Sequence, residues 1–291
     1  MSQHADVFAV LTSASYQGEQ GRDSDLEHVL ERAKDAGVRH IVSWCEDMHH
    51  ALHALKLSRV AEGVHCAISL DPGVFSRRGM RAPYLKAVRR YAIRYRSEVL
   101  GVTSSGLKSY SSATQVRRLQ RALGVAADQQ LPVFVEWNKK IMPKFMPIFE
   151  DLVKMLPATV FHSFQGSEVE ARTLLDKGFY LGISCRSVLV QQTLEGLAKL
   201  PLNQVLVHSG TPESNYLNDH PLVTTKFPAA PPTDWRPGLM LQGRGEPACV
   251  AQVIEVVAAT RGEDPASVAA QLWKNACNVF FPDEDYCTGV Y

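Results

Sequence analysis

Residues 158–184 read ATVFHSFQGSEVEARTLLDKGFYLGIS, a pattern typical of one strand, one helix and a second strand. Short apolar runs that begin at Ala158 and Phe179 have the composition and length of buried strands. Residues 168–177, between the two runs, have a helical pattern. A helix-length connection between two strands is the crossover that parallel strands require. This stretch therefore predicts a parallel α/β fold.

The same alternation of strands and helices continues along the whole chain. Eight strands joined by helices form a parallel sheet, most economically a closed (β/α)8 barrel of the TIM type. The alternative is an open doubly wound sheet, but no GxGxxG follows the first strand to favour it. The expected strands begin near Val7, Val38, Val64, Val99, Leu131, Ala158, Phe179 and Gln204. The expected helices cover residues 26–36, 47–62, 84–96, 115–130, 144–156, 168–177, 188–199, 247–261 and 265–277.

The length of 291 residues fits one barrel domain over residues 1–291. A proline-rich stretch at 211–245 interrupts the alternation. Because two further helices follow it, we interpret this stretch as a long irregular loop and not as a linker. For the first helix, Ser24 and Glu27 predict a capping box, and Gly37 predicts the end.

The net charge, the cysteines and the N-terminal residues bear on the cellular compartment and on the possible partners of the protein. The formal net charge of +1 gives no overall attraction to polyanions, and six scattered cysteines contain no CxxC pair. We therefore expect a reducing intracellular compartment, the cytoplasm or nucleus, without disulfides. Residues 1–8, MSQHADVF, carry no recognisable targeting signal, and no apolar run reaches the ~18 residues that span a bilayer.

Six phrases together resemble the TatD-related deoxyribonucleases over nearly the whole chain. The resemblance implies a TatD-like barrel with two divalent cations at its mouth, where a phosphodiester is held and water is activated for hydrolysis. The phrases are DLEHVLERAKDAGVRHIV (25–42), GVTSSGLKSY (101–110), LPVFVEWN (131–138), FHSFQGSEVEARTLLDKGFYLGIS (161–184), VLVHSGTP (205–212) and WKNACNVFF (273–281).

Most of the metal ligands that the resemblance implies are replaced in this chain. Serines stand in place of two histidines and one glutamate, a glutamate in place of a histidine, and a glycine in place of an aspartate; one histidine remains. The positions, in chain order, are Ser13, Ser15, Ser104, Glu136, His162 and Gly210. A serine hydroxyl carries no charge to offset the dehydration of a cation, and two cations beside one carboxylate repel each other. The sequence therefore favours a catalytically inactive homologue without a cofactor, retained as a binding or structural subunit of a protein or nucleoprotein assembly.

A divergent enzyme is the alternative. Period-two alternation directs His208 to the same side of its strand as Gly210. Glu136, His162 and His208 would then converge at the barrel mouth as a reduced site for one divalent metal, Zn, Mg or Mn, in a hydrolase. The other interpretation, which we favour, is a closed cluster of hydrogen-bonded polar side chains.

Residues 77–96 form a dense basic stretch without an acidic residue. Tyrosines and small apolar residues recur at helical spacing on the opposite face of the expected helix. The stretch predicts contact with an acidic protein surface or with nucleic acid, or else a solvated outer helix of the barrel. The near-neutral net charge favours docking to a protein. The basic residues are Arg77, Arg78, Arg81, Lys86, Arg89, Arg90, Arg94 and Arg96.

Overall fold

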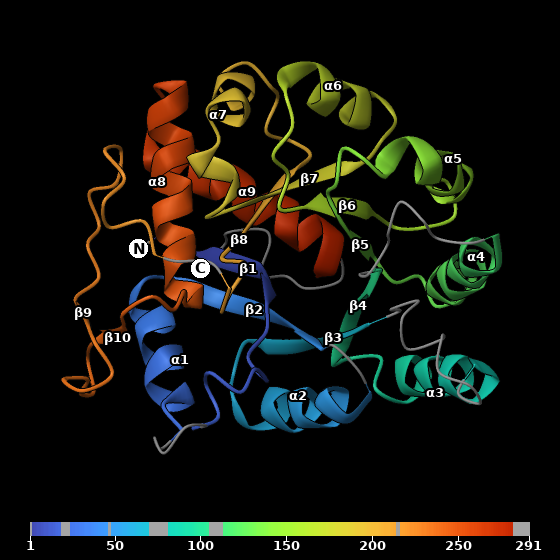
Figure 1. Cartoon of the computed structure of the whole chain (residues 1–291), viewed down its shortest axis with the longest axis horizontal. Helices are drawn as coiled ribbons and strands as arrows, with labels where there is room; N and C mark the ends of the chain where they lie inside the picture. Colours follow the sequence, from blue (N-terminus) through green and yellow to red (C-terminus); the bar gives the residue numbers. More distant parts are fainter. Residues whose placement is uncertain are drawn as a thin grey trace.

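Eight parallel strands stand in sequence order in one sheet, which curves into a nearly closed barrel with helices around it (Figure 1). The computed structural model describes residues 2–18, 24–45, 48–69, 81–104, 113–213 and 216–281. The strands are β1 (His4–Ala9), β2 (Val38–Cys45), β3 (Val64–Ser69), β4 (Val99–Ser104), β5 (Val133–Glu136), β6 (Thr159–His162), β7 (Tyr180–Ser184) and β8 (Val205–His208).

The first and last strands lie side by side, so the sheet is not the open doubly wound alternative. Just after β8, the N–H of Gly210 donates to the carbonyl of Phe8 in β1 at 3.2 Å. The N–H of Val10 donates to the carbonyl of Thr211 at 3.1 Å. The predicted (β/α)8 fold class is confirmed.

The helices follow in the order that the sequence predicts, and all but the last lie around the outside of the barrel (Figure 1). They are α1 (Leu26–Asp35), α2 (Met48–Val60), α3 (Arg81–Arg94), α4 (Ala113–Asp128), α5 (Met142–Leu152), α6 (Glu168–Asp176), α7 (Gln191–Leu197), α8 (Val250–Arg261) and α9 (Pro265–Phe280). Residues 188–199 differ from the expected single helix, because a 3-10 turn at Ser187–Leu189 precedes α7. No helix in the described part of the chain is long and apolar enough to cross a membrane.

The barrel interior is closed at one end by the last helix. The end of α9 carries Ala276, Val279 and Phe280, which join the inward-facing residues of the strands in one buried cluster. Asn275 also donates hydrogen bonds to the carbonyls of Leu202 and Val205, where β8 begins. This end lies at the amino ends of the strands, so their carboxyl ends form the free mouth.

The predicted capping box at the first helix is wrong. Asp25 is the N-cap of α1, and its side chain makes no capping hydrogen bond. The hydroxyl of Ser24 instead donates to the carbonyl of Tyr16 at 2.9 Å. A complete capping box occurs at α6, where Ser167 and Glu170 bond to each other's backbone N–H groups.

Residues 211–213 and 216–245 belong to the long loop that the prolines predict. Two short strands, β9 (Ala229–Ala230) and β10 (Met240–Leu241), pair with each other inside it. The loop is attached to the barrel through α8, where Gln252 accepts from the N–H of Leu217 and donates to the carbonyl of Thr225. The predicted helices that follow the loop are confirmed as α8 and α9.

Candidate functional site

The candidate residues gather at the mouth of the barrel. Ser104, Glu136, His162 and His208 are the last residues of β4, β5, β6 and β8. Because all eight strands are parallel, their carboxyl ends share one rim, where TIM barrels carry their functional residues. Glu136 and His162 are paired neighbours in the sheet.

A cavity of about 400 Å³ opens at this rim. Ser13, Glu136, His162 and Gly210 line it, and the hydroxyl of Ser15 lies 3.2 Å from that of Ser13. Arg186, Glu213 and the hydroxyl residues Ser69, Thr103 and Ser163 are also among the lining residues. The structure thus brings five of the six candidate positions to one cavity or beside it.

Ser104 is the exception. Thr103 lines the cavity, and successive strand residues point to opposite faces, so Ser104 points away from the barrel axis. Its hydroxyl is buried and has no hydrogen-bond partner in the described residues. Ser104 therefore contributes nothing to the cavity.

Phe8 of β1 lies at the centre of the mouth and covers the retained histidine. Its ring stacks on that of His162, with centroids 4.2 Å apart, and lies 5.4 Å from that of His208. Trp44 and Phe134 complete the cluster, at 5.1 and 6.1 Å from Phe8. An apolar ring therefore covers the face of the His162 imidazole and packs at a tilt against that of His208.

The two histidines are neutral and enclosed. Burial lowers the pKa of His162 to about 3, and burial together with the neighbouring His162 holds the pKa of His208 well below its usual value. Nε2 of His208 accepts a hydrogen bond of 3.1 Å from the backbone N–H of Ser163, so this nitrogen is occupied. Nε2 of His162 is buried and has no partner among the described residues.

Glu136, His162 and His208 do not form the metal site that the sequence allowed. Across the described residues, no three His, Cys, Asp or Glu side chains are placed to hold an ion together. Nε2 of His208 accepts a hydrogen bond from Ser163, Nε2 of His162 is buried, and of the three only Glu136 is exposed. The residues at the mouth do not fit the two-cation centre either, because Ser13, Ser15 and Gly210 supply no charge.

Removing the Phe8 ring is expected to raise the pKa of His162. In Phe8→Ala, water reaches the imidazole, and the desolvation that lowers its pKa to about 3 is relieved. We expect the value to move toward 6.5, measured by NMR titration of the histidine ring protons. Leu52→Ala, a change at an exposed side chain on α2, is the control. An unchanged His162 pKa in Phe8→Ala would show that the ring is not what shields it.

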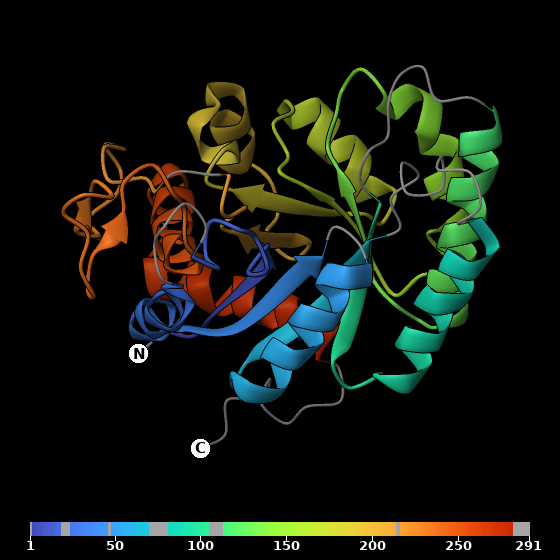
Figure 2. The ribbon, with the colours of Figure 1, turned by 60° about the horizontal axis from the view of Figure 1, so that its bottom comes forward.

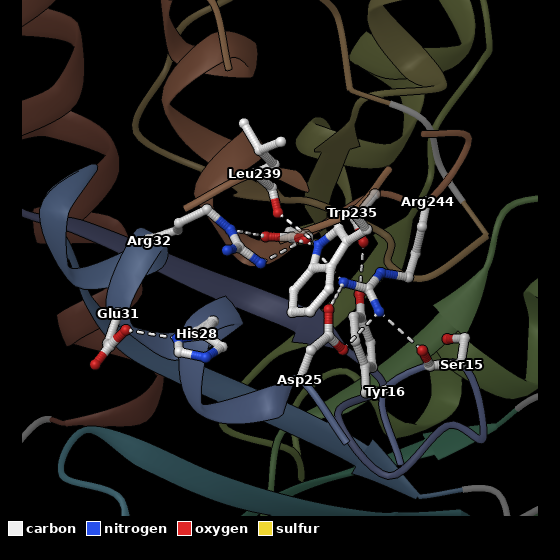
Figure 3. A network of polar contacts seen from close by, with 11 residues as sticks. Ser15, Tyr16, Asp25, His28, Glu31, Arg32, Trp235, Leu239 and Arg244 are labelled. Carbon is white, nitrogen blue, oxygen red and sulfur yellow. Dashed lines mark hydrogen bonds and ion pairs between the residues drawn. The ribbon is translucent and has the colours of Figure 1, made fainter. Parts of the chain in front are cut away.

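A buried ionic network fixes the loop that carries Ser13 and Ser15 (Figure 3). The guanidinium of Arg244 donates to the carbonyl of Ser15 at 2.8 Å and to both carboxylate oxygens of Asp25. It also donates to Glu246 at 2.9 Å, and Glu246 in turn accepts two hydrogen bonds from Arg32. Two cations and two carboxylates therefore balance in the interior, and they connect the loop before α8 to α1.

Sequence reasoning missed both Phe8 and this network. Phe8 appears in the sequence as an ordinary apolar strand residue, and no local pattern marks its contact with His162. Arg244 and Glu246 stand in the run QGRGEPAC, where two opposite charges between small residues were the available signal.

The described part of the basic stretch lies on the outer wall of the barrel, on α3 and in the turn that follows it. Arg77 and Arg78 lie outside the described residues, and so does the side chain of Arg81. The remaining basic side chains of the stretch are exposed: Lys86, Arg89, Arg90, Arg94 and Arg96. Tyr91 and Tyr95 are half-buried and pack against the core, as the predicted apolar face requires.

Comparisons with known proteins agree on one family. A family model described as TatD related DNase matches residues 11–281. Deoxyribonuclease Tat-D of Schizosaccharomyces pombe is 25% identical over 272 residues, covering 88% of this chain and 87% of its own. The 3'-5' ssDNA/RNA exonuclease TatD of Salmonella typhimurium is 27% identical over 282 residues, covering 94% and 98%. The crystal structure of a hydrolase TatD family protein from Entamoeba histolytica superposes with a TM-score of 0.82 at 17% identity, covering 97% and 99%, which shows the shared fold.

Proposed function

The chain belongs to the TatD related DNase family, and we propose that it is a catalytically inactive member retained as a binding or structural subunit of a protein or nucleoprotein assembly. The observation that carries the proposal is the mouth itself, where Phe8 covers His162 and the ligand positions Ser13, Ser15 and Gly210 carry no charge.

Charge at the mouth also opposes the binding of a phosphodiester. Glu136 is an exposed carboxylate in the cavity, and Glu213 lines the same cavity. Arg186 is the cation among the described lining residues, and it lies 4.0 Å from Glu213. Without bound cations, a phosphodiester would meet the Glu136 carboxylate directly, and like charges at close range repel. This arrangement supports loss of the hydrolytic reaction.

The protein is expected to leave single-stranded DNA and RNA intact. Cleavage needs a positioned cation to activate water, and the residues at the mouth are unsuited to hold one. The measurement is gel analysis of both substrates with added Mg²⁺, Mn²⁺ or Zn²⁺, together with elemental analysis of the purified protein. We expect less than about one equivalent of tightly bound divalent metal, given the loss of charged ligands.

One result would favour the alternative, a divergent metal-dependent hydrolase that uses Glu136, His162 and His208. Glu136 and His162 do share the cavity and are neighbours in the sheet. Stoichiometric metal that is lost in His162→Ala, or cleavage that is lost in the same variant, would overturn the proposal of inactivity. The relatives named as ssDNA/RNA exonucleases make single-stranded DNA and RNA the substrates for this test.

We place the protein in a reducing intracellular compartment, the cytoplasm or nucleus. Five cysteines in the described part of the chain are buried thiols and not disulfides, which is the usual state in such a compartment. Its partner is expected to be a protein assembly, with nucleic acid as the alternative through residues 77–96. No membrane partner is proposed.

A further inference from the structure

We infer that the outer wall formed by α3 and α4 docks an acidic protein segment that carries an apolar side chain. This inference deepens the proposed function, since it names a surface and a partner for the binding role. We call the surface the basic wall and define it by one exposed apolar residue and seven exposed cations. Its residues are Ile93 with Lys86, Arg89, Arg90, Arg94, Arg96, Arg117 and Arg121.

The basic wall spans two neighbouring helices (Figure 2). Arg89 of α3 and Asp128 of α4 form an ion pair of 3.7 Å across them. Three charged residues share one side of α4, because Arg121 follows Arg117 by four residues and Asp128 follows Arg121 by seven. Because Asp128 contacts α3, the two arginines of α4 stand on the side that faces α3. The structure thus adds two arginines of α4 to the basic surface that the sequence indicated on α3 alone.

The cations of the basic wall repel one another. Like charges at spacing i, i+4 destabilise a helix. Three pairs of cations have this spacing: Lys86 with Arg90, Arg90 with Arg94, and Arg117 with Arg121. Asp128 is the one carboxylate that pairs with this set within the described residues, and more than half of both side chains in that pair is exposed. A bound acidic segment would remove this repulsion.

An apolar side chain stands among these cations. The side chain of Ile93 is 58% exposed. Arg90 and Arg89 lie three and four residues before it on the same helix, and Arg96 lies in the turn that follows α3, so cations flank Ile93 on both sides along the chain. An exposed apolar residue within a polar rim is the arrangement of a small binding hot spot between proteins.

Two aromatic residues of the basic stretch, Tyr91 on α3 and Tyr95 just after it, argue against single-stranded nucleic acid as the partner. Proteins that bind single strands stack bases on exposed aromatic rings. Tyr91 and Tyr95 are half-buried against the core. The ring of Tyr95 is also contacted by the guanidinium groups of Arg59 and Arg94, at 5.1 and 5.6 Å. An exposed isoleucine among exposed cations fits an amphipathic acidic segment better.

The test uses the full chain and a fluorescently labelled peptide in which leucines recur among glutamates. We expect salt-sensitive binding in fluorescence anisotropy, weakened about 100-fold when Arg89, Arg90 and Arg94 are all changed to glutamate. Ile93→Ser should weaken it about fivefold, through the lost apolar contact alone. The matched control changes Lys140, Lys154 and Arg236 to glutamate, which alters net charge equally at exposed positions outside the basic wall.

A second measurement separates docking from a structural role. Arg90→Glu alone should raise Tm by roughly 2 °C, because it replaces repulsion from Lys86 and Arg94 by attraction, and it should still weaken peptide binding. No binding of the peptide, an equal effect of the control set, or tighter binding of single-stranded RNA or DNA at physiological ionic strength would overturn the inference. None of these results depends on metal content or cleavage. A result that contradicts docking at the basic wall would therefore leave the proposed inactivity untouched, and the reverse also holds.

Discussion

Arg244→Met is expected to destabilise the protein by about 3–5 kcal/mol, the typical cost of removing one partner from a buried ion pair. Asp25 and Glu246 are both buried, and each accepts hydrogen bonds from the Arg244 guanidinium. The two carboxylates hold the pKa of Arg244 above its usual value against the effect of burial, so the residue is charged in the fold. Without it, the buried Asp25 carboxylate loses its cation, and Glu246 keeps only Arg32. Urea unfolding measures the loss, and Tm should fall by roughly 10 °C.

Arg32→Met is the matched control for this network. It also replaces an arginine by methionine, but at the other end of the network. Because Glu246 keeps its hydrogen bond from Arg244, we expect a smaller decrease in the free energy of unfolding. Adding Asp25→Asn to Arg244→Met should recover part of the stability, since one of the uncompensated charges is removed. A free energy of unfolding for Arg244→Met within about 1 kcal/mol of the wild type would show that the network contributes little.

The barrel was predictable because its signals are local. Apolar runs and helical spacing depend on neighbouring residues, and residues 158–184 already contain one complete strand–helix–strand unit. The lost charges at Ser13, Ser15 and Gly210 could also be identified before the structure, because the resemblance to the TatD-related deoxyribonucleases implies charged or imidazole ligands at these positions.

The interior of the mouth was not predictable, because it depends on contacts between distant residues. The Ser163–His208 hydrogen bond joins positions 45 residues apart, and the Arg244–Asp25 pair joins positions 219 apart. The outward direction of Ser104 depends on how β4 is oriented in the sheet, and no residue type reveals this. For the same reason, the sequence predicted that His208 and Glu136 could bind one metal, although Nε2 of His208 accepts a hydrogen bond from the N–H of Ser163.

Asp6 is expected to make the stability of the fold depend on pH. It lies on β1 at the seam with the segment after β8, where Oδ1 accepts from the N–H of Ser209 at 3.0 Å and Oδ2 accepts from the Ser209 hydroxyl. Burial raises the pKa of this carboxyl from 3.8 to about 6, and the hydrogen bonds from Ser209 and Phe8 offset only part of that effect. The fold therefore prefers protonated Asp6.

The sign follows from the raised pKa. Below about pH 4, Asp6 is protonated in both folded and unfolded chains, and its contribution to stability is fully present. As the pH rises through about 6, the unfolded chain is already ionised and the folded chain must bury a charge. The contribution of Asp6 to the free energy of unfolding should fall by about 3 kcal/mol over this range.

Asp6→Asn isolates this contribution, because asparagine keeps an acceptor for the Ser209 N–H and does not ionise. Urea unfolding of both proteins between pH 4 and 8 should give curves that diverge as the pH rises, with the variant gaining about 3 kcal/mol relative to wild type. Other carboxyls titrate equally in both proteins, so the difference reports Asp6 alone. Asp234→Asn, at an exposed position in the loop between β9 and β10, is the control and should follow the wild type at every pH. A constant difference between Asp6→Asn and wild type over the range would mean that Asp6 is ionised in the fold at pH 4, with Ser209 stabilising the charge more than burial opposes it.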